Sequence, residues 1–236
     1  MPTTGIEPAV ELAVVGPVRV GWAFGDDARR RVLRGLLAAA GAAEASPDDV
    51  AHGCPTCGST SHGPLRASSG AVVLSLSHAD GPTGLTVGAI ASAEDAASVG
   101  VDVEPDRGDL PMAELGALFA PAEPPTIRRW TEIEAVAKAD GRGLRIAPHG
   151  IRFSDEPGAL LPGGVLAVVE GRARIEVAPS PAPAGYVVSV AIAPSRAVDP
   201  DRPIAPNRAT DPGRAPDPAR ALGPARPIRP TPGSAR

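Results

Sequence analysis

Aromatic residues and cysteines are scarce in this 236-residue chain, and each scarcity narrows what the protein can be. Aromatics make up 3% of the sequence, so a core must be built from Ala, Val, Leu and Ile. Two cysteines are too few for the disulfide framework of a small secreted protein. There is also no apolar run of about 18 residues and no basic leader before an apolar segment, so we expect a cytoplasmic protein without a membrane partner.

The chain also lacks a strong charge and has almost no lysine. Its formal net charge is -4, and no basic field runs through the part expected to fold, so we expect no nucleic-acid partner. Lys138 is the only lysine, because the other 22 of the 23 basic residues are arginine. An ammonium is a compact, mobile point charge, whereas a guanidinium is a rigid fork. The single lysine therefore suggests a task that needs the former.

The sequence changes character near its end. The chain up to about residue 193 is long enough for one large domain or two small ones with a real core. Residues 1–9 show no periodicity and are expected to be loose. From 194 to 236, 11 of 43 residues are proline and apolar clusters are absent. Such a segment buries too little apolar surface to offset its conformational entropy, so a disordered Pro/Arg-rich tail is predicted.

Hydrophobic periodicity predicts a mixture of strands and helices. A helix is expected over 28–40, with Asp26 and Asp27 capping its start, because Asp side chains accept hydrogen bonds from unpaired amides. A short helix is expected over 111–119, and another should begin at an N-cap, Thr126, and contain Trp130 to Lys138. Strands are predicted over 10–22 with a break at Gly16-Pro17, and over 71–76, 84–92, 98–105, 165–169, 173–177 and 186–192, the last as a central strand.

The strand at 98–105 carries the first candidate site. Its valines alternate with Gly100, Asp102 and Glu104, so both carboxylates should point to one face of the strand. Trp130, Glu134 and Lys138 stand at i, i+4 and i+8.

These three residues share one flank of a helix, so Glu134 can join the two strand carboxylates. Three acidic oxygens suit a hard cation such as Mg²⁺, or Mn²⁺ in its place. The alternative is that the acids are merely solvated on the open face of an edge strand.

Two other groups of residues are candidates for binding. Arg29, Arg30, Arg31 and Arg34 cluster near the start of the first helix, as either a solvated face or an anion-binding surface. His78 ends a buried strand just before a loop, where chemistry is often placed.

A third group of residues offers ligands for a soft metal. His52, Cys54, Cys57 and His62 can be read as four zinc ligands, since Cys-x2-Cys with flanking His is sensible for a tetrahedral ion. The alternative is a Gly/Pro turn whose cysteines are simply packed.

Four stretches in this order resemble the signature motifs of the surfactin-type 4'-phosphopantetheinyl transferases. The last two are the more specific, because that family combines a V-G-[VI]-D-x-E strand with a W-[ST]-x-x-E-[AS]-x-x-K helix. The resemblance spans about residues 20 to 192 and implies an α+β fold of two similar halves, 10–97 and 98–193, related by a pseudo-twofold axis. The matching stretches are Gly63 to Arg66, Leu74 to His78, Val99 to Glu104, and Trp130 to Leu144.

The resemblance also implies roles for individual residues. Glu134 would be the base and Lys138 would neutralise pyrophosphate charge, so these two are the expected catalytic residues. The metal ligands implied are Asp102, Glu104 and Glu134. The residues implied for coenzyme A are His78, Ser77, Arg66, Arg29, Arg30 and Arg31.

The activity implied is Mg²⁺-dependent transfer of the 4'-phosphopantetheine arm of coenzyme A to a serine of an acyl or peptidyl carrier protein, with release of 3',5'-ADP. A monomer is expected, because two internal halves can build the cleft. The alternatives are a catalytically weakened homologue that binds coenzyme A or a carrier protein, and a zinc-stabilised interaction module. The chain departs from the family at Ile133, where lysine is common, at the displaced basic residue Arg66, and in a shorter segment between Glu104 and Trp130.

Overall fold

The computed structural model describes most of the chain up to Ser195. Residues Met1–Val198 form one compact unit, and Asp199–Arg236 form a second that lies outside the described residues. Most of the expected loose N-terminus, nearly all of the expected tail and all but one residue of the helix predicted over 111–119 lie outside them as well. The described residues are 9–42, 44–54, 57–80, 83–107, 119, 124–170 and 174–195.

The first sheet has six strands, all antiparallel, in the order β1-β2-β6-β5-β4-β3. The predicted strands before residue 93 are confirmed, including the break at Gly16-Pro17, whereas the three-residue strands β3 and β4 were not predicted. The strands are β1 (Glu11–Val15), β2 (Val18–Phe24), β3 (Val50–His52), β4 (Leu65–Ala67), β5 (Val72–Ala79) and β6 (Leu85–Ser92).

The second sheet has five antiparallel strands in the order β7-β11-β10-β9-β8. The strand predicted to be central, β11, lies between β7 and β10, so that prediction is confirmed. Strand β8 was not predicted. The strands are β7 (Ala96–Pro105), β8 (Ile151–Pro157), β9 (Val165–Val169), β10 (Ile175–Ser180) and β11 (Tyr186–Pro194).

The two sheets follow the same path. In the first half, β2 leads into α1 (Ala28–Ala39), and the strands then lie in the order β2-β6-β5-β4-β3, with β1 added at the edge. In the second half, β7 leads into α3 (Ile127–Asp140), and the order is β7-β11-β10-β9-β8. The α+β class predicted from the sequence is therefore confirmed. One sheet ends at Ser92 and the next begins at Ala96, close to the expected 97/98 boundary.

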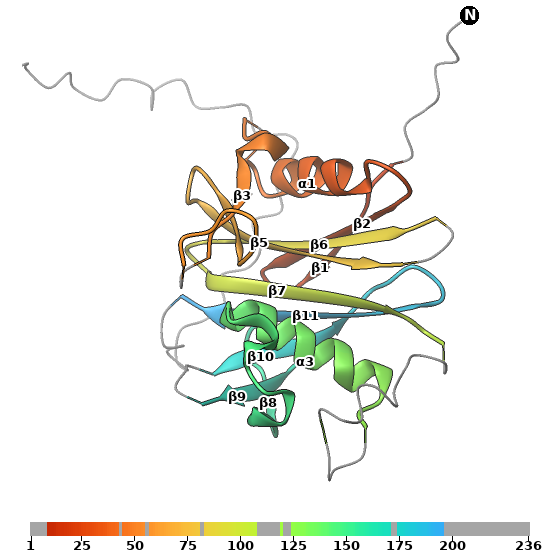
Figure 1. The fold of residues 1–236 in the computed structure, drawn as a ribbon, viewed down its shortest axis with the longest axis vertical. Coiled ribbons are helices and arrows are strands. Elements are labelled where there is room, and N and C mark those ends of the chain that lie inside the picture. The colour runs from red at the N-terminus through yellow and green to blue at the C-terminus, as the bar shows by residue number, and fades with distance from the viewer. Residues whose placement is uncertain are drawn as a thin grey trace, which may run out of the picture. The chain divides into compact units, whose positions relative to one another are not determined.

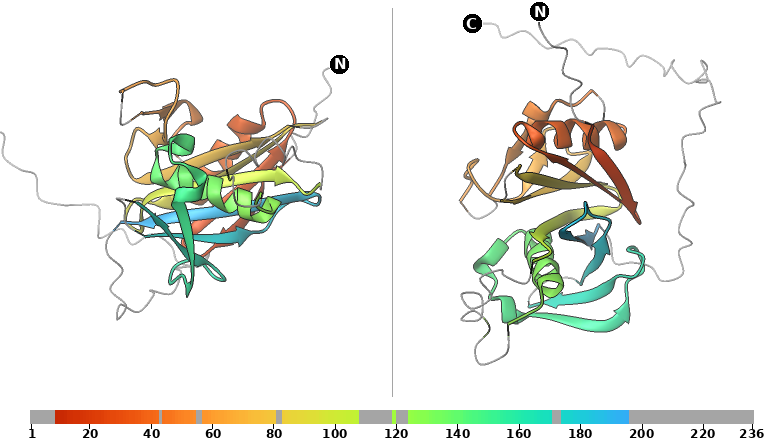
Figure 2. Two further views of the ribbon diagram at one scale, coloured as in Figure 1. Left: turned by 60° about the horizontal axis from the view of Figure 1, so that its bottom comes forward. Right: turned by 90° about the vertical axis from the view of Figure 1, so that its right-hand side faces the viewer.

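Three apolar clusters show how the layers pack. One cluster joins the two sheets and includes Val20 and Val87 from the first and Val101 and Val190 from the second. The other two lie between α1 and the first sheet and between α3 and the second. Each sheet thus has one face on the other sheet and one on its own helix, as Figures 1 and 2 show.

Helix α1 is confirmed, but the way it begins differs from the prediction. Asp27 is the N-cap residue, yet its side chain makes no capping hydrogen bond. Its φ of 58° lies in the left-handed region, which turns the chain sharply into the helix and is strained for a residue other than Gly. Asp27 therefore begins the helix through a left-handed turn and not through a side-chain hydrogen bond.

Helix α3 begins at the predicted N-cap, and a glycine ends it. The Thr126 hydroxyl accepts a hydrogen bond of 3.2 Å from the Arg129 amide, and Gly141 ends the helix with φ at 85°, a conformation that glycine adopts without strain. Short 3-10 turns lie at Pro47–Asp49, Gly143–Arg145 and Pro148–Gly150. None of the described helices combines the length and apolar composition that crossing a bilayer requires.

A glycine sets the distance between α3 and the second sheet. A Cβ at Gly100 would overlap the Ala135 carbonyl oxygen and lie 2.7 Å from the Ala139 amide. The Ser98 hydroxyl also donates to the Ala139 carbonyl. Because backbone meets backbone here, the helix lies unusually close to β7, and the side chains that follow Gly100 on that face reach those of α3.

Candidate functional site

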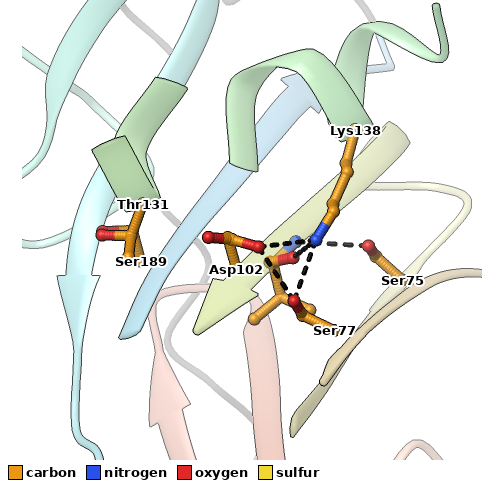
Figure 3. Close-up of polar contacts among 7 residues, drawn as sticks. Ser75, Ser77, Asp102, Thr131, Lys138 and Ser189 are labelled. Atoms are coloured by element: carbon orange, nitrogen blue, oxygen red, sulfur yellow. Dashed lines mark hydrogen bonds and ion pairs between the residues drawn. The ribbon is translucent and has the colours of Figure 1, made fainter. Parts of the chain in front are cut away.

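The centre of the site is an ion pair between α3 and β7. The Lys138 ammonium lies 2.6 Å from Oδ1 of Asp102, whose side chain is only 5% exposed. Ser77 on β5 completes the group, because its hydroxyl donates to the same Oδ1 at 2.8 Å and accepts from Lys138 at 2.9 Å. Figure 3 shows the three side chains converging from three elements. The only lysine of the chain therefore compensates a carboxylate that is buried between the two halves.

The neighbouring backbone of β7 is tied to the same group. Strand β7 is at the edge of its sheet, so one side of it makes no ladder hydrogen bonds within that sheet. On that side the Val101 amide donates to the Ser75 hydroxyl at 3.2 Å, and the Val101 carbonyl accepts from the Lys138 ammonium at 3.1 Å. Two serines of β5 and one lysine of α3 thus hold the middle of β7 in place.

Glu134 is strongly altered by its surroundings. Burial raises its pKa to about 7, and the nearby carboxylates of Asp102 and Glu104 add to the rise while Lys138 opposes it. A carboxyl that titrates near neutral pH is suited to accept a proton in catalysis.

The two strand carboxyls are shifted in the same direction. Burial also raises the pKa of Glu104, with the charge of Asp102 as the next cause, and the Trp130 indole opposes it as a hydrogen-bond donor. For Asp102, burial pushes the pKa up, and Lys138 and Ser77 oppose that rise.

The three carboxylates form an electrostatic cluster, but their oxygens have not converged. Within the described part of the chain, the only three ligand-type side chains with ligand atoms all within 4.8 Å of one another are Cys54, Cys57 and His62. A cation shared by Asp102, Glu104 and Glu134 would therefore need their side chains to turn toward each other.

The donor set fits such an ion chemically. All three side chains offer oxygen, and Oδ2 of Asp102 is buried without a hydrogen-bond partner, which is costly unless another group fills the position. Among the described residues, Lys138 is the one cation that lowers the pKa of all three acids. Their mutual repulsion therefore favours the open arrangement, and a divalent cation would favour the closed one.

A cavity of about 640 Å³ opens beside this cluster. Lys138 and Ser75 line it, so the cavity and the ion pair are parts of one site. The described residues around it include no Asp or Glu, whereas the basic side chains that line it are Arg29, His52, His62, His78, Lys138, Arg142 and Arg145. The size is typical of a small-molecule site, and the charge favours an anionic ligand.

Two of the residues predicted to contact phosphate line this cavity. His78 on β5 and Arg29 on α1 both face it, and Nδ1 of His78 lies 3.0 Å from the Thr86 hydroxyl. Burial lowers the pKa of His78, and the positive charges of Arg29 and Lys138 lower it further. The neutral imidazole can therefore gain a proton when an anion enters, because the anion would offset those charges.

The other predicted phosphate contacts lie elsewhere and do not line the cavity. Arg30 makes a two-pronged ion pair with Asp48, at 2.7 and 2.8 Å. Arg31 is buried and donates to the Phe24 carbonyl, and Arg66 passes beside Gly53. Ser77 is buried against Asp102, so it positions the ion pair instead of facing the cavity.

The chain matches no protein-family model and no curated protein. Its chemistry is therefore inferred from its own residues and their geometry.

Neither Arg128 nor Arg129 replaces the lysine that the resemblance would place at position 133. Ile133 is buried in the cluster beneath α3. Arg128 donates to the Val188 carbonyl and the Ser189 hydroxyl, and Arg129 pairs with Glu132 at 2.8 Å while stacking on the Phe153 ring. These two guanidiniums anchor α3 to its sheet.

Sequence reasoning missed three residues of the site. Ser75 stands two residues before Ser77 on the same face of β5, and the period of a strand could have identified it. Arg142 and Arg145 line the cavity just after α3, where Arg142 also pairs with Asp140. Basic residues in a Gly-rich exit from a helix that carries Lys138 were a usable signal for an anion site.

Proposed function

We propose that this protein transfers the 4'-phosphopantetheine arm of coenzyme A to a serine of an acyl or peptidyl carrier protein. The observation that carries the proposal is that Lys138 belongs both to the acidic cluster on β7 and to the wall of the basic cavity. Transfer of phosphopantetheine by cleavage of a pyrophosphate linkage needs both features side by side: cations for the phosphates, and acids for a metal and for a proton. The shared path of the two sheets supports the pseudo-twofold fold of that enzyme family.

The proposed roles follow from where each group lies. His78, Arg29, Arg142 and Arg145 would hold the phosphates and adenosine end of coenzyme A, with Lys138 at the pyrophosphate. Asp102, Glu104 and Glu134 would hold Mg²⁺, which when bound spreads the charge that develops on the phosphoryl oxygens.

The bond changes then balance without any further reactant. The carrier serine oxygen forms a bond to the phosphorus that bears pantetheine, and the bond from that phosphorus to the bridging oxygen breaks. Glu134 would accept the serine proton. The leaving group, 3',5'-ADP, departs with the bridging oxygen, whose charge Lys138 would neutralise.

Two observations favour the second candidate, a homologue that binds coenzyme A or a carrier protein with little turnover. The carboxylate oxygens of Asp102, Glu104 and Glu134 do not all lie within 4.8 Å of one another, since among the described residues only another cluster meets that limit. Position 133, where the family commonly has lysine, is a buried isoleucine. Tight coenzyme A binding with no transfer over hours would identify this candidate.

The test is a transfer assay with the full chain, coenzyme A, Mg²⁺ and a panel of apo carrier domains, read by intact mass. We expect a carrier to gain one phosphopantetheine, and Glu134→Gln to lower the rate about 10²- to 10⁴-fold, as the loss of a general base does. Glu132→Gln is the matched control, because Glu132 is on the same helix but pairs with Arg129. Equal rates for Glu134→Gln and Glu132→Gln would contradict the proposal.

The proposal also fixes where the protein works. Coenzyme A and carrier proteins are intracellular, so we propose a cytoplasmic location. We also propose that the protein acts as a monomer and without nucleic acid. Either fatty-acid, polyketide or non-ribosomal peptide assembly supplies carriers of the required chemistry.

A further inference from the structure

The connection between β3 and β4 brings together three side chains that the proposed transfer does not use. The ligand atoms of Cys54, Cys57 and His62 all lie within 4.8 Å of one another, and Sγ of Cys57 is 3.3 Å from Nε2 of His62. From this geometry we propose that Cys54, Cys57 and His62 bind a zinc ion that organises one wall of the cavity.

The separations match what zinc requires. In a tetrahedral site with Zn–S near 2.3 Å and Zn–N near 2.0–2.1 Å, neighbouring ligand atoms lie about 3.5–3.8 Å apart. The cluster is within about 1 Å of that arrangement before any ion draws it in. Two thiolates and an imidazole are soft ligands that select zinc over the hard cation suited to Asp102 and Glu104, so the two metal sites would not compete.

Two backbone hydrogen bonds hold the turn around Cys54. The Cys54 amide donates to the Ser59 carbonyl and the Gly58 amide to the Cys54 carbonyl, each at 2.9 Å. Gly63, with φ at 98°, passes so close that a Cβ there would lie 2.7 Å from the Cys54 Cα. The segment after His62 is therefore pressed against Cys54, which holds the imidazole beside the two sulfurs.

The structure corrects the expectation of four protein ligands. His52 is not part of the cluster, because its Nδ1 lies 2.7 Å from the Gly63 carbonyl. That contact orients the segment that carries His62, so His52 is a positioning residue. Zinc would thus have three protein ligands, with the fourth position left to solvent.

The location of this zinc site gives the ion a role. His62, Gly63, Pro64 and Leu65 line the basic cavity, as Lys138 does. A zinc ion would fix this wall, which has little regular structure of its own: β3 and β4 are three residues each. Loss of zinc should therefore loosen the wall before it affects the sheets.

The experiment measures zinc bound by the purified full chain, without any assay of activity. After equilibration with zinc and removal of the excess, elemental analysis should find about one zinc per chain, and cobalt in its place should give the visible absorption of thiolate ligation. The variants Cys57→Ser and His62→Asn should each weaken zinc binding by about 10-fold or more. Both residues are exposed, so these variants should fold, which circular dichroism would verify.

Two matched controls separate a site from a general loss of histidine. His52→Asn should still bind one zinc with a modestly weaker affinity, and the exposed His149→Asn should bind as the natural chain does. A natural chain with less than about 0.1 zinc, and with both thiols reacting freely with a thiol reagent in the presence of zinc, would overturn the proposal. So would a Cys57→Ser variant that retains full affinity. Neither outcome bears on phosphopantetheine transfer.

Discussion

The first and second sheets place different side chains at matching points. In β2 the segment Val20-Gly21 lies beneath α1, and a Cβ at Gly21 would meet Leu36 of that helix. In β7 the segment Val99-Gly100 lies beneath α3 in the same way. Two residues further along, the first strand has Ala23 and the second has Asp102.

The contrast lies in the chemistry of one buried position. Ala23 is 3% exposed in the core under α1, which is the ordinary content of such a position. Asp102 is 4% exposed at the corresponding place under α3, and a buried carboxylate is costly unless it is paired. A carboxylate kept there, with a lysine to compensate it, indicates a functional group.

The first half nevertheless contributes to the site. Ser75 and Ser77 reach from β5 to the backbone and the carboxylate of β7. The first half therefore helps to hold the strand that carries Asp102 in place.

The largest expected effect comes from removing the Lys138 ammonium, which compensates the buried carboxylate of Asp102. Lys138→Met should lower the free energy of unfolding by about 3–5 kcal/mol, because Asp102 would remain buried without its partner. The double variant Asp102→Ala, Lys138→Met, which makes the second half resemble the first, should recover most of that loss. Urea titrations at pH 7.5 would measure both, and a double variant no more stable than Lys138→Met would break the comparison.

The next largest effect is the difference in stability lost when Gly100 of β7 and Gly21 of β2 are replaced by alanine. Gly100→Ala should lower the free energy of unfolding by about 3 kcal/mol, because the new Cβ would overlap backbone atoms of α3 that cannot turn aside. Gly21→Ala should cost about 1 kcal/mol, since there the nearest atoms are the ends of Leu12 and Leu36, at 2.8 and 3.3 Å. Equal losses in thermal unfolding would mean that the two helices lie equally close to their strands.

Glu134→Gln should make the protein more stable at pH 8 by about 1–3 kcal/mol. The pKa of Glu134 is near 7 in the folded protein against 4.5 as its ordinary value. Between those values the folded chain binds the extra proton, so the natural protein loses stability as pH rises, whereas below pH 4.5 the two chains should agree. Thermal unfolding from pH 4 to 8 would show this. As a control, substitution of the exposed residue in Glu44→Gln should leave the stability unchanged at both pH 4 and pH 8.

The smallest effects concern the two helix starts. Thr126→Ala should cost about 1 kcal/mol, because it removes the hydrogen bond to the Arg129 amide. Asp27→Gly should instead raise stability by up to about 1 kcal/mol, since glycine adopts a φ of 58° without strain and Asp27 makes no cap bond to lose. A loss of stability in Asp27→Gly would show that its carboxylate has a role at this turn.

The strands and helices that were predicted correctly are those with a clear local period. Alternating valines identified β7 and β11, and the 3.6-residue period identified α1 and α3. Strands β3 and β4 are too short for any period, and β8 is largely exposed at the edge of its sheet with the sequence IRFSDEP. The prediction that the Asp27 side chain caps α1 was wrong, because residue type alone does not reveal a positive φ.

The features of the site likewise divide into those that local spacing predicted and those that it did not. Local spacing was enough to place Asp102 and Glu104 on one face of a strand and Glu134 and Lys138 on one flank of a helix. The contact of Ser77 with Lys138 joins residues 61 positions apart, and no local pattern contains it. Arg30 and Arg29 are adjacent in sequence, yet one pairs with Asp48 and the other faces the cavity, because the helix turns them in different directions.

The hydrogen bonds at Val101 have a consequence for how the molecule behaves among copies of itself. An edge strand with unpaired amides and carbonyls is a template on which another chain can add a strand and begin a fibre. At the middle of β7 the Ser75 hydroxyl occupies the amide and the Lys138 ammonium occupies the carbonyl. The lysine of the proposed reaction thus also occupies a carbonyl with which a strand of another chain could otherwise pair.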